Sequence, residues 1–131
     1  ILYSQLINYK KIIKERKKIW MKYFSTFKNL KSELIENKKP SSKKIVINYH
    51  MFFLICKNLY IRTKLLTELK KNRVFSTFHY IPLHKSKFGS KYFKKKLIVT
   101  EELSKKIIRL PLWIGMNQNF ILNKIKKILN D

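Results

Sequence analysis

The sequence predicts one small α/β (α+β) domain in which helices pack on a small sheet. Two patterns support this prediction: a long amphipathic helix opens the chain, and β-branched or aromatic runs then alternate with helical segments. A chain of 131 residues can bury one modest core, so a second domain is not expected. No internal repeat is visible in the sequence.

The first element is a helix, because apolar residues recur at steps of three, four or seven along one face. The lysines fall largely off that face, as in a helix that packs on a core rather than one that lies on a membrane. The apolar positions are Leu2, Leu6, Tyr9, Ile13, Trp20, Phe24 and Phe27.

A loop, two strands and a helix are expected next. The Pro and Ser content of residues 38–42 indicates the loop. The β-branched run 45–47 predicts one strand, and the continuous apolar run 51–56 predicts a second, more buried one. A helix of about three turns follows, and Asn72 can end it in the left-handed conformation. Its apolar face consists of Ile61, Leu65, Leu66 and Leu69.

A third strand over residues 74–78 leads directly into His79 and Tyr80. The polar stretch 85–96 is expected to form an exposed loop. Thr100 should then cap a helix, with two glutamates in its first turn, where the helix dipole favours negative charge.

The apolar face of that helix falls on Leu103, Ile107 and Ile108. Pro111 ends the helix, since it biases the residue before it to extended geometry. A last helix is expected to start at the cap Asn117. Its inward residues are Phe120, Ile121, Ile125 and Ile128.

The charge is strongly positive, with 31 Lys and Arg against 7 Asp and Glu and a formal net charge of +24. By itself this points to nucleic acid or an anionic membrane surface. The composition suggests another cause, because alanine is absent and 27 lysines stand beside four arginines. Residue types with GC-rich codons are depleted and those with AT-rich codons are enriched, as drift in an AT-rich genome would produce. Scarce arginine also argues against base recognition.

The single cysteine, Cys56, lies within the apolar run 51–56, which indicates a buried, unreactive thiol and a cytoplasmic location. No stretch approaches the ~18 consecutive apolar residues that a membrane-spanning helix needs. The chain begins with Ile1, already in a helical pattern and without the features of a signal peptide, which suggests a piece of a longer protein.

Few residues can carry chemistry. Three histidines and one cysteine without paired carboxylates make a poor zinc site, so no metal is expected. Two glycines cannot build a phosphate loop, and apolar surroundings would raise the pKa of Cys56 rather than activate it. The stretch FHYIPLH (78–84) is different. It carries His79 and Tyr80 from a strand end into a loop braced by Pro82, where both can bind an anionic oxygen.

Four blocks in one order resemble the C-terminal part of the sugar-nucleotide aminotransferases of the DegT/DnrJ/StrS group. They are the opening QL with its R…IW helix, NYHMFFLIC (48–56), RVFSTFHYIPLH (73–84) and VTEELSKKIIRLPLWIGM (99–116). Together they extend over essentially the whole chain. Within the group they are most similar to transaminases that form dTDP-4-amino-4,6-dideoxygalactose.

The resemblance implies that residues 1–131 form the small C-terminal domain of the aspartate-aminotransferase-like (type I pyridoxal-phosphate transferase) fold. Such enzymes are homodimers that use pyridoxal 5′-phosphate, held by a lysine as a Schiff base. They move an amino group from glutamate to a dTDP-4-keto-6-deoxyhexose for cell-surface polysaccharide.

The family's catalytic parts belong to its large N-terminal domain, which is absent from this sequence. No lysine lies in a Schiff-base motif, and no aspartate precedes Asp131 that could pair with the pyridinium. The chain alone is therefore expected to have no catalytic residue, to bind no cofactor and to be inactive.

The resemblance also places His79, Tyr80 and His84 on the substrate side of the small domain, facing the nucleotide sugar. Alternation along an extended segment puts His79 and Tyr80 on opposite sides, so one can face a cleft while the other braces the loop. Their N–H and O–H donors suit a pyrophosphate, and His84 is the less direct member of the set. The alternative is that all three have only a structural role and hold the loop against the domain. The basic stretch after His84 departs from the family's small, glycine-rich residues, so its contact with substrate is left open.

Two functions of other classes also remain open. A basic nucleic-acid-binding module would need arginines and aromatic residues clustered on one exposed face, whereas lysines are spread over every predicted helix. The other alternative is a non-functional structural remnant of an eroding gene, which would fit both the missing domain and the drifting composition.

Overall fold

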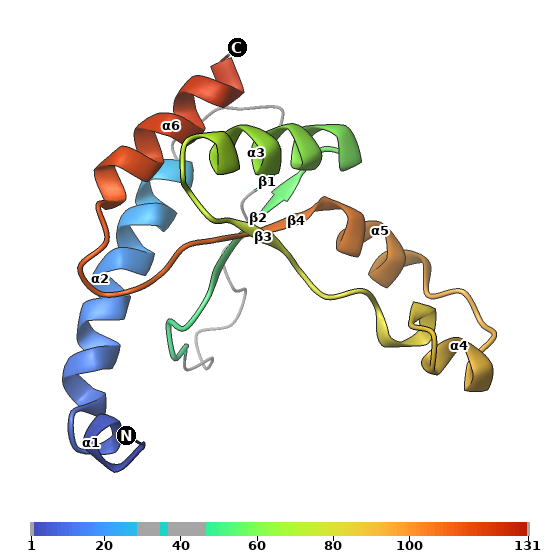
Figure 1. Cartoon of the computed structure of the whole chain (residues 1–131), viewed down its shortest axis with the longest axis horizontal. Coiled ribbons are helices and arrows are strands. Elements are labelled where there is room, and N and C mark those ends of the chain that lie inside the picture. The colour runs from blue at the N-terminus through green and yellow to red at the C-terminus, as the bar shows by residue number, and fades with distance from the viewer. Residues whose placement is uncertain (1, 29–34, 37–46, 131) are drawn as a thin grey trace.

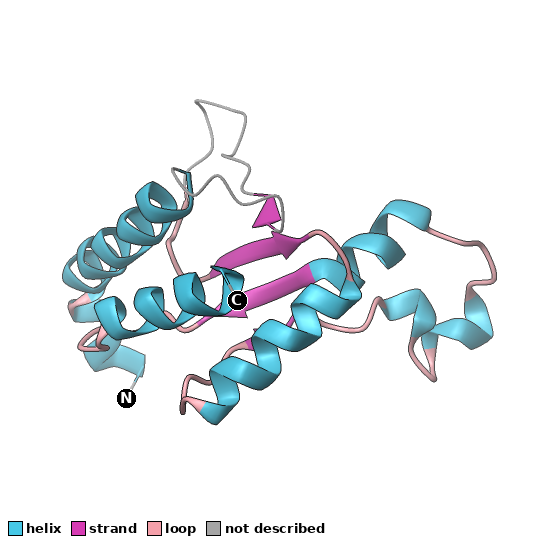
Figure 2. Cartoon of the chain, turned by 90° about the horizontal axis from the view of Figure 1, so that it is seen from above, coloured by secondary structure: helices cyan, strands magenta, loops and turns pink. Residues whose placement is uncertain are grey.

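The computed structural model describes residues 2–28, 35–36 and 47–130, in which helices pack on a small sheet (Figures 1 and 2). The helices are α1 (Leu2–Ile7), α2 (Tyr9–Lys28), α3 (Leu59–Lys71), α4 (Gly89–Tyr92), α5 (Ile98–Lys106) and α6 (Gln118–Asn130), with a 3₁₀ turn η1 (Leu83–Lys85). The strands are β1 (Ile35–Glu36), β2 (Phe52–Cys56), β3 (Thr77–Phe78) and β4 (Ile107–Leu110). The predicted α+β class is confirmed. The loop predicted at 38–42 and the first two residues of the strand predicted at 45–47 lie outside the described residues.

The sheet has the order β1-β2-β4-β3, and each neighbouring pair is antiparallel. Ile108 of the inner strand β4 pairs with Leu54 of β2 on one side and with Phe78 of β3 on the other. Because both neighbours run against β4, β2 and β3 run in the same direction, and α3 is the crossover between them. This order puts β3, from which the FHYIPLH segment departs, at an edge of the sheet.

One face of the sheet is buried and the other is open. Along β2, Phe52, Leu54 and Cys56 point inward and are at most 2% exposed, whereas Phe53 between them is 44% exposed. The strand predicted at 51–56 is confirmed, but only alternate residues of it are fully buried. Side chains from α2, α3 and α6 complete the core on the inward face: Tyr23, Phe27, Leu65, Leu69, Ile121, Leu122 and Ile125.

The long opening helix is present, with an interruption at Asn8 between α1 and α2. Its C-terminal half is held to the domain by polar contacts. The buried Tyr23 hydroxyl donates a hydrogen bond to the Pro111 carbonyl over 2.9 Å, and burial raises the pKa of this phenol well above its usual value. The Gln118 amide at the start of α6 donates to the Ile19 carbonyl over 2.7 Å. In the described part of the chain, no helix is both long and apolar enough to cross a membrane.

Two helix ends test the predicted caps. Asn117 caps α6 as expected, because its side-chain oxygen accepts a hydrogen bond from the Phe120 N–H over 3.1 Å. Phe120 itself is half-exposed rather than inward, which corrects the prediction for that residue. At the end of α3, Asn72 has φ −88°, and the left-handed conformation falls on Arg73, with φ 59°. The helix therefore ends at Asn72 as predicted, but the left-handed residue is the next one, Arg73.

The predictions for residues 98–110 need the largest correction. The residue that precedes α5 is Leu97, so Thr100 lies inside the helix and does not cap it. Ile107 and Ile108 were expected on the apolar face of this helix, but they belong to β4. Ile108 is fully buried, and pairing with two other strands outweighs the local helical spacing.

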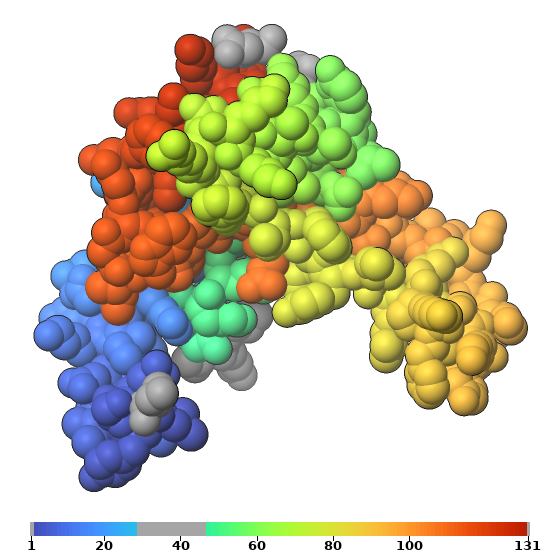
Figure 3. Space-filling model, viewed as in Figure 1, coloured from blue at the N-terminus to red at the C-terminus, as the bar shows by residue number. Residues whose placement is uncertain are grey.

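The turn η1, α4 and α5 form an arm that stands away from the rest of the domain (Figures 1 and 3). The predicted strand at 74–78 is reduced to Thr77–Phe78, and the predicted loop at 85–96 contains α4. The loop's expected exposure holds for residues 91–96. A side chain on Gly89 would place its Cβ 2.0 Å from the Leu83 carbonyl oxygen, so glycine permits the close approach of α4 to η1.

Candidate functional site

The segment from Phe78 to Lys85 runs between the end of β3 and the arm, and hollows lie on both sides of it. His79 and Tyr80 lie next to each other, with ring centroids 5.1 Å apart. Tyr80 is 73% exposed, and the Arg109 guanidinium lies 5.9 Å from its ring centroid. The strand end therefore presents an exposed phenol beside a largely covered imidazole.

His79 opens into a pocket of about 520 Å³, which we call the histidine pocket. Its other walls include Tyr80, Thr100, Leu103 and Ile107, so α5 forms the far side. The Nδ1 atom of His79 is buried and has no hydrogen-bond partner among the described residues. A buried polar atom without a partner is uncommon, which makes His79 a candidate for a functional role.

His84 lies elsewhere and has protein partners. Its Nε2 atom is 3.1 Å from Oε1 of Glu101 on α5, and its ring packs edge-on against Phe93. The His84 side chain is only 8% exposed and lines a separate hollow. Among the three residues predicted from the sequence, the structure brings His79 and Tyr80 together in one pocket and places His84 outside it.

Glu101 links η1 to the start of α5 through three polar contacts. Besides His84, it accepts a hydrogen bond from the Leu97 N–H at the start of α5 and pairs with the Lys85 ammonium, each over 3.2 Å. The His84 hydrogen bond, followed by the Lys85 and Leu97 bonds, holds the pKa of Glu101 below its ordinary value, although partial desolvation opposes the shift. The sequence placed Glu101 in the first turn of a helix but did not predict this set of partners.

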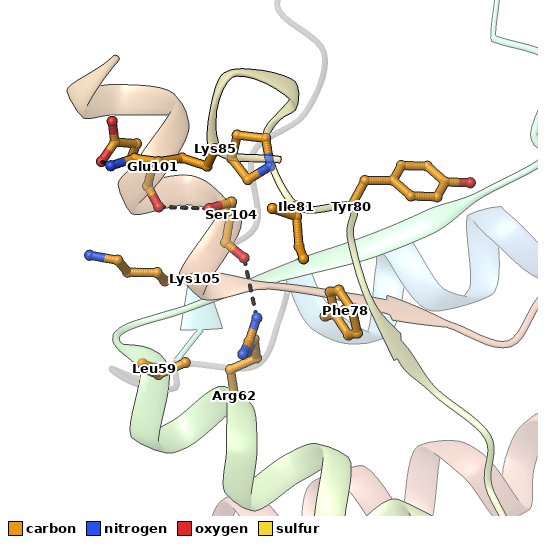
Figure 4. A pocket seen from close by; sticks show the side chains of 10 residues that line it. Leu59, Arg62, Phe78, Tyr80, Ile81, Lys85, Glu101, Ser104 and Lys105 are labelled. Carbon is orange, nitrogen blue, oxygen red and sulfur yellow. Dashed lines mark hydrogen bonds and ion pairs between the residues drawn. The ribbon is translucent and has the colours of Figure 1, made fainter. Parts of the chain in front are cut away.

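A second pocket of about 520 Å³ lies between α3, β3 and α5 (Figure 4). We call it the arginine pocket, because Arg62 rises into it from α3, with Phe78, Lys85, Ser104 and Lys105 around it. Tyr80 lines both pockets. The arginine pocket was not foreseen from the sequence.

Arg62 is held in a defined orientation. Its Nη1 donates to the Ser104 carbonyl over 3.2 Å, in the last turn of α5, and its guanidinium lies 5.9 Å from the Phe78 ring centroid. Its Nε is buried without a hydrogen-bond partner in the described part of the protein. One feature of the sequence could have drawn attention to Arg62: the composition strongly favours lysine, yet arginine stands at this position.

The described residues do not fit pyridoxal phosphate. The carboxylates whose side chains are described are all engaged by a lysine or histidine: Glu15, Glu68, Glu101 and Glu102. None is left to pair with a pyridinium, and no lysine with a described side chain is buried. Nor do the described His, Cys, Asp and Glu residues form a group of three that could hold a metal.

Cys56 is buried, and burial raises the pKa of its thiol to about 11. The predicted burial of this thiol is confirmed, and the direction of its pKa shift is the predicted one. The described residues therefore contribute pockets and polar contacts, and the functional hypothesis rests on binding.

Comparison with known proteins identifies the group. The sequence profile of the DegT/DnrJ/EryC1/StrS aminotransferase family matches residues 1–128. The chain belongs to this family. Its resemblance to the sugar-nucleotide aminotransferases, seen from four sequence blocks, is thereby confirmed at the level of the DegT/DnrJ/EryC1/StrS family.

Solved structures of two aminotransferases share the fold. TlmJ of Streptoalloteichus hindustanus has a TM-score of 0.85 with 17% identity, over 98% of this chain and 34% of TlmJ. PseC of Helicobacter pylori, an aminotransferase of pseudoaminic acid biosynthesis, has a TM-score of 0.83 with 19% identity, over 98% of this chain and 35% of PseC. At such low identity these similarities establish the fold alone.

A third relative is an uncharacterised protein of Methanocaldococcus jannaschii, MJ1066. It is 29% identical over 124 residues, which make up 90% of this chain and 32% of the relative. The chain thus spans about a third of the length of the proteins it matches. The match fits a part of a DegT/DnrJ/EryC1/StrS aminotransferase.

Proposed function

We propose that this chain serves as the small C-terminal domain, residues 1–131, of a pyridoxal-phosphate-dependent sugar-nucleotide transaminase. The observation that carries the proposal is the family match over residues 1–128, together with a fold that matches about a third of the length of the aminotransferases TlmJ and PseC. In this proposal another stretch of polypeptide supplies the Schiff-base lysine and holds the cofactor. The chain itself supplies substrate contacts and one wall of the cleft, as part of a homodimer.

The substrate we propose is a dTDP-4-keto-6-deoxyhexose, with glutamate as amino donor. The support is the similarity of the blocks at 48–56, 73–84 and 99–116 to transaminases that form dTDP-4-amino-4,6-dideoxygalactose. The product would enter cell-surface polysaccharide, such as a common antigen, and the reaction would take place in the cytoplasm.

His79 and Tyr80 are the side chains proposed to contact the nucleotide sugar. His79 and Tyr80 both line the histidine pocket, Nδ1 of His79 has no hydrogen-bond partner among the described residues, and the Tyr80 side chain is exposed, so both residues have hydrogen-bonding capacity left for a ligand. His84 would act less directly, because its bond to Glu101 fixes the loop from which the other two project.

The proposal is tested by co-expressing the chain with the polypeptide encoded directly upstream. We expect that polypeptide to carry a Schiff-base lysine, and the pair to transfer the amino group of glutamate to a dTDP-4-keto-6-deoxyhexose. Either partner alone should be inactive. A folded, pyridoxal-phosphate-loaded pair without transfer to any nucleotide-linked keto sugar would refute the proposal.

The binding roles are tested in the same complex, or in a complete family enzyme with the same segment. Tyr80→Ala and His79→Ala should each raise the KM for the dTDP-sugar about tenfold with an unchanged melting temperature. Phe75→Ala is the matched control, since Phe75 is as exposed as Tyr80 and lines neither pocket. A lowered melting temperature with an unchanged KM would instead give the segment a structural role.

A further inference from the structure

The arginine pocket concentrates positive charge in a way that the histidine pocket does not. Three of its lining residues are cations, Arg62, Lys85 and Lys105, against one carboxylate, Glu101, which is already engaged by Lys85 and His84. The remaining walls are largely aromatic or aliphatic, including Phe78 and Tyr80. Such a pocket suits an anionic group attached to an apolar or planar one.

Arg62 is the centre of this charge. Its guanidinium bonds to a neutral carbonyl, and no ion pair with a carboxylate is found for it among the described residues. A partly buried charge without a counter-ion is costly, and its buried Nε still lacks a partner. An anion that entered the pocket would relieve that cost, and the planar fork of arginine matches the oxygens of a phosphate group.

Lys85 and Lys105 can reinforce Arg62 from the rim. Lys85 pairs with Glu101 over 3.2 Å and Lys105 with Glu102 over 2.9 Å, and both lysine side chains are half-exposed. The Lys105–Glu102 pair is exposed on both sides and contributes little, so the Lys105 side chain can turn toward a stronger anion at small cost. In Figure 4 both lysine side chains lie on the α5 side of the pocket with their ammonium groups turned away from Arg62, so each must reorient to meet an anion bound there.

The histidine pocket offers a different environment. Its lining includes Thr100 and Leu103 from the arm and Ile107 at the start of β4, and it contains no Lys or Arg. A multiply charged group would leave water there without a compensating cation. Residues 80–82 line both pockets, so the two hollows adjoin along this segment and a ligand can extend from one to the other past it.

We propose that the arginine pocket is a diphosphate subsite, with Arg62 as the central ligand and Lys85 and Lys105 at its rim. This inference rests on the proposed function and assigns parts of the nucleotide sugar to different pockets. The diphosphate lies against Arg62, and Tyr80 and His79 contact the portion beyond it.

The test is a calorimetric titration of the folded chain with dTDP, inorganic diphosphate and thymidine, in ~0.15 M NaCl to screen long-range attraction. We expect dTDP and diphosphate to bind and thymidine to bind far more weakly. Arg62→Gln should weaken both anions by about tenfold or more, since it removes charge-assisted hydrogen bonds. Arg73→Gln removes the same charge from an exposed position beyond α3 and should change the affinity by less than about twofold.

Arg62→Gln also loses the hydrogen bond to Ser104, so it could weaken binding by disturbing the fold. A second pair of variants therefore tests the subsite without changing Arg62. Lys105→Gln should weaken diphosphate binding several-fold, whereas Lys126→Gln, on the exposed side of α6, should not. Equal losses within both pairs would mean that the net charge alone attracts the anion and would overturn the subsite. Absence of diphosphate binding to the wild-type chain, or equal binding of thymidine and dTDP, would also overturn it. The co-expressed pair could still transfer the amino group if either result were found. Failure of the diphosphate subsite is therefore distinguishable from failure of the proposed transaminase function.

Discussion

At the scale of single residues, Glu101 shows how one side chain can position a whole segment. It receives the His84 imidazole, the Lys85 ammonium and the Leu97 N–H, which come from η1 and from the start of α5. These bonds connect η1 to the start of α5. They hold the arm together although η1, α4 and α5 contain no buried residue. The orientation of the loop that carries His79 and Tyr80 therefore depends on a carboxylate that is not itself in the histidine pocket.

Glu101→Gln should lower the melting temperature of the chain at pH 7. The folded-state pKa of Glu101 lies below its ordinary value of 4.5, mainly because of the His84 hydrogen bond, so the carboxylate stabilises the fold above pH 4.5. That stabilisation is lost as the pH falls through the lowered pKa. The difference between wild type and variant should therefore shrink in acid when melting is followed by circular dichroism.

Glu68→Gln is the control for this effect, because Glu68 has only the exposed pair with Lys71. It should change the melting temperature less than Glu101→Gln at pH 7. An equal change for the two variants, or a difference between Glu101→Gln and wild type that is unaffected by acid, would count against the role given to Glu101.

The residues of the candidate site were only partly predictable from the sequence. His79 and Tyr80 could be singled out, because histidine is rare in this chain and the pair follows a β-branched and aromatic run. The bond of His84 to Glu101 spans 17 positions, and that of Arg62 to Ser104 spans 42, so both depend on where the arm meets α3. Neither contact can be predicted from the residue pattern of a single helix or strand.

At the scale of elements, β4 shows why one strand was missed. Residues 103–108 have helical spacing of their apolar positions, and the residue types of this short run suit either structure. The choice is made by β2 and β3, which supply hydrogen-bonding partners on both sides of β4. By contrast, α3 and α6 were predictable, since each has a full apolar face and an asparagine cap.

Two neighbouring residues of β2 test the one-sided burial of the sheet. Leu54→Ala should lower the free energy of unfolding by about 2–5 kcal/mol, because it leaves a cavity between the sheet and the helices. Phe53→Ala removes a larger side chain, but from the open face, and should cost only about 1 kcal/mol. Urea denaturation measures both values, and equal costs would show that the outer face is covered in solution.

At the scale of the whole molecule, the charge of +24 does not gather into a nucleic-acid surface with the expected features. Exposed lysines lie on α2, α3, α5 and α6 and along the arm, and only four arginines are present in the sequence. The function proposed for this member of the DegT/DnrJ/EryC1/StrS aminotransferase family does not need this charge. The excess of lysine then fits compositional drift, with the arginine pocket as a local exception.

The same abundance of lysine shapes the last prediction, which concerns the cofactor. Pyridoxal phosphate added to the isolated chain and trapped with borohydride should label many lysines weakly and none stoichiometrically. The reason is that no lysine with a described side chain is buried, and Glu102 raises the pKa of Lys105, which keeps that amine protonated. Intact-mass measurement and peptide mapping distinguish the two patterns.

The control for this labelling experiment is the co-expressed pair, in which one lysine of the upstream polypeptide should be labelled stoichiometrically and the lysines of this chain only in the background. Amino transfer from glutamate to a dTDP-4-keto sugar should appear in the pair and not in the isolated chain, because the described carboxylates leave no partner for the pyridine nitrogen. One stoichiometric lysine in the isolated chain, together with amino transfer, would contradict the division of labour between a substrate-binding part and a cofactor-binding part.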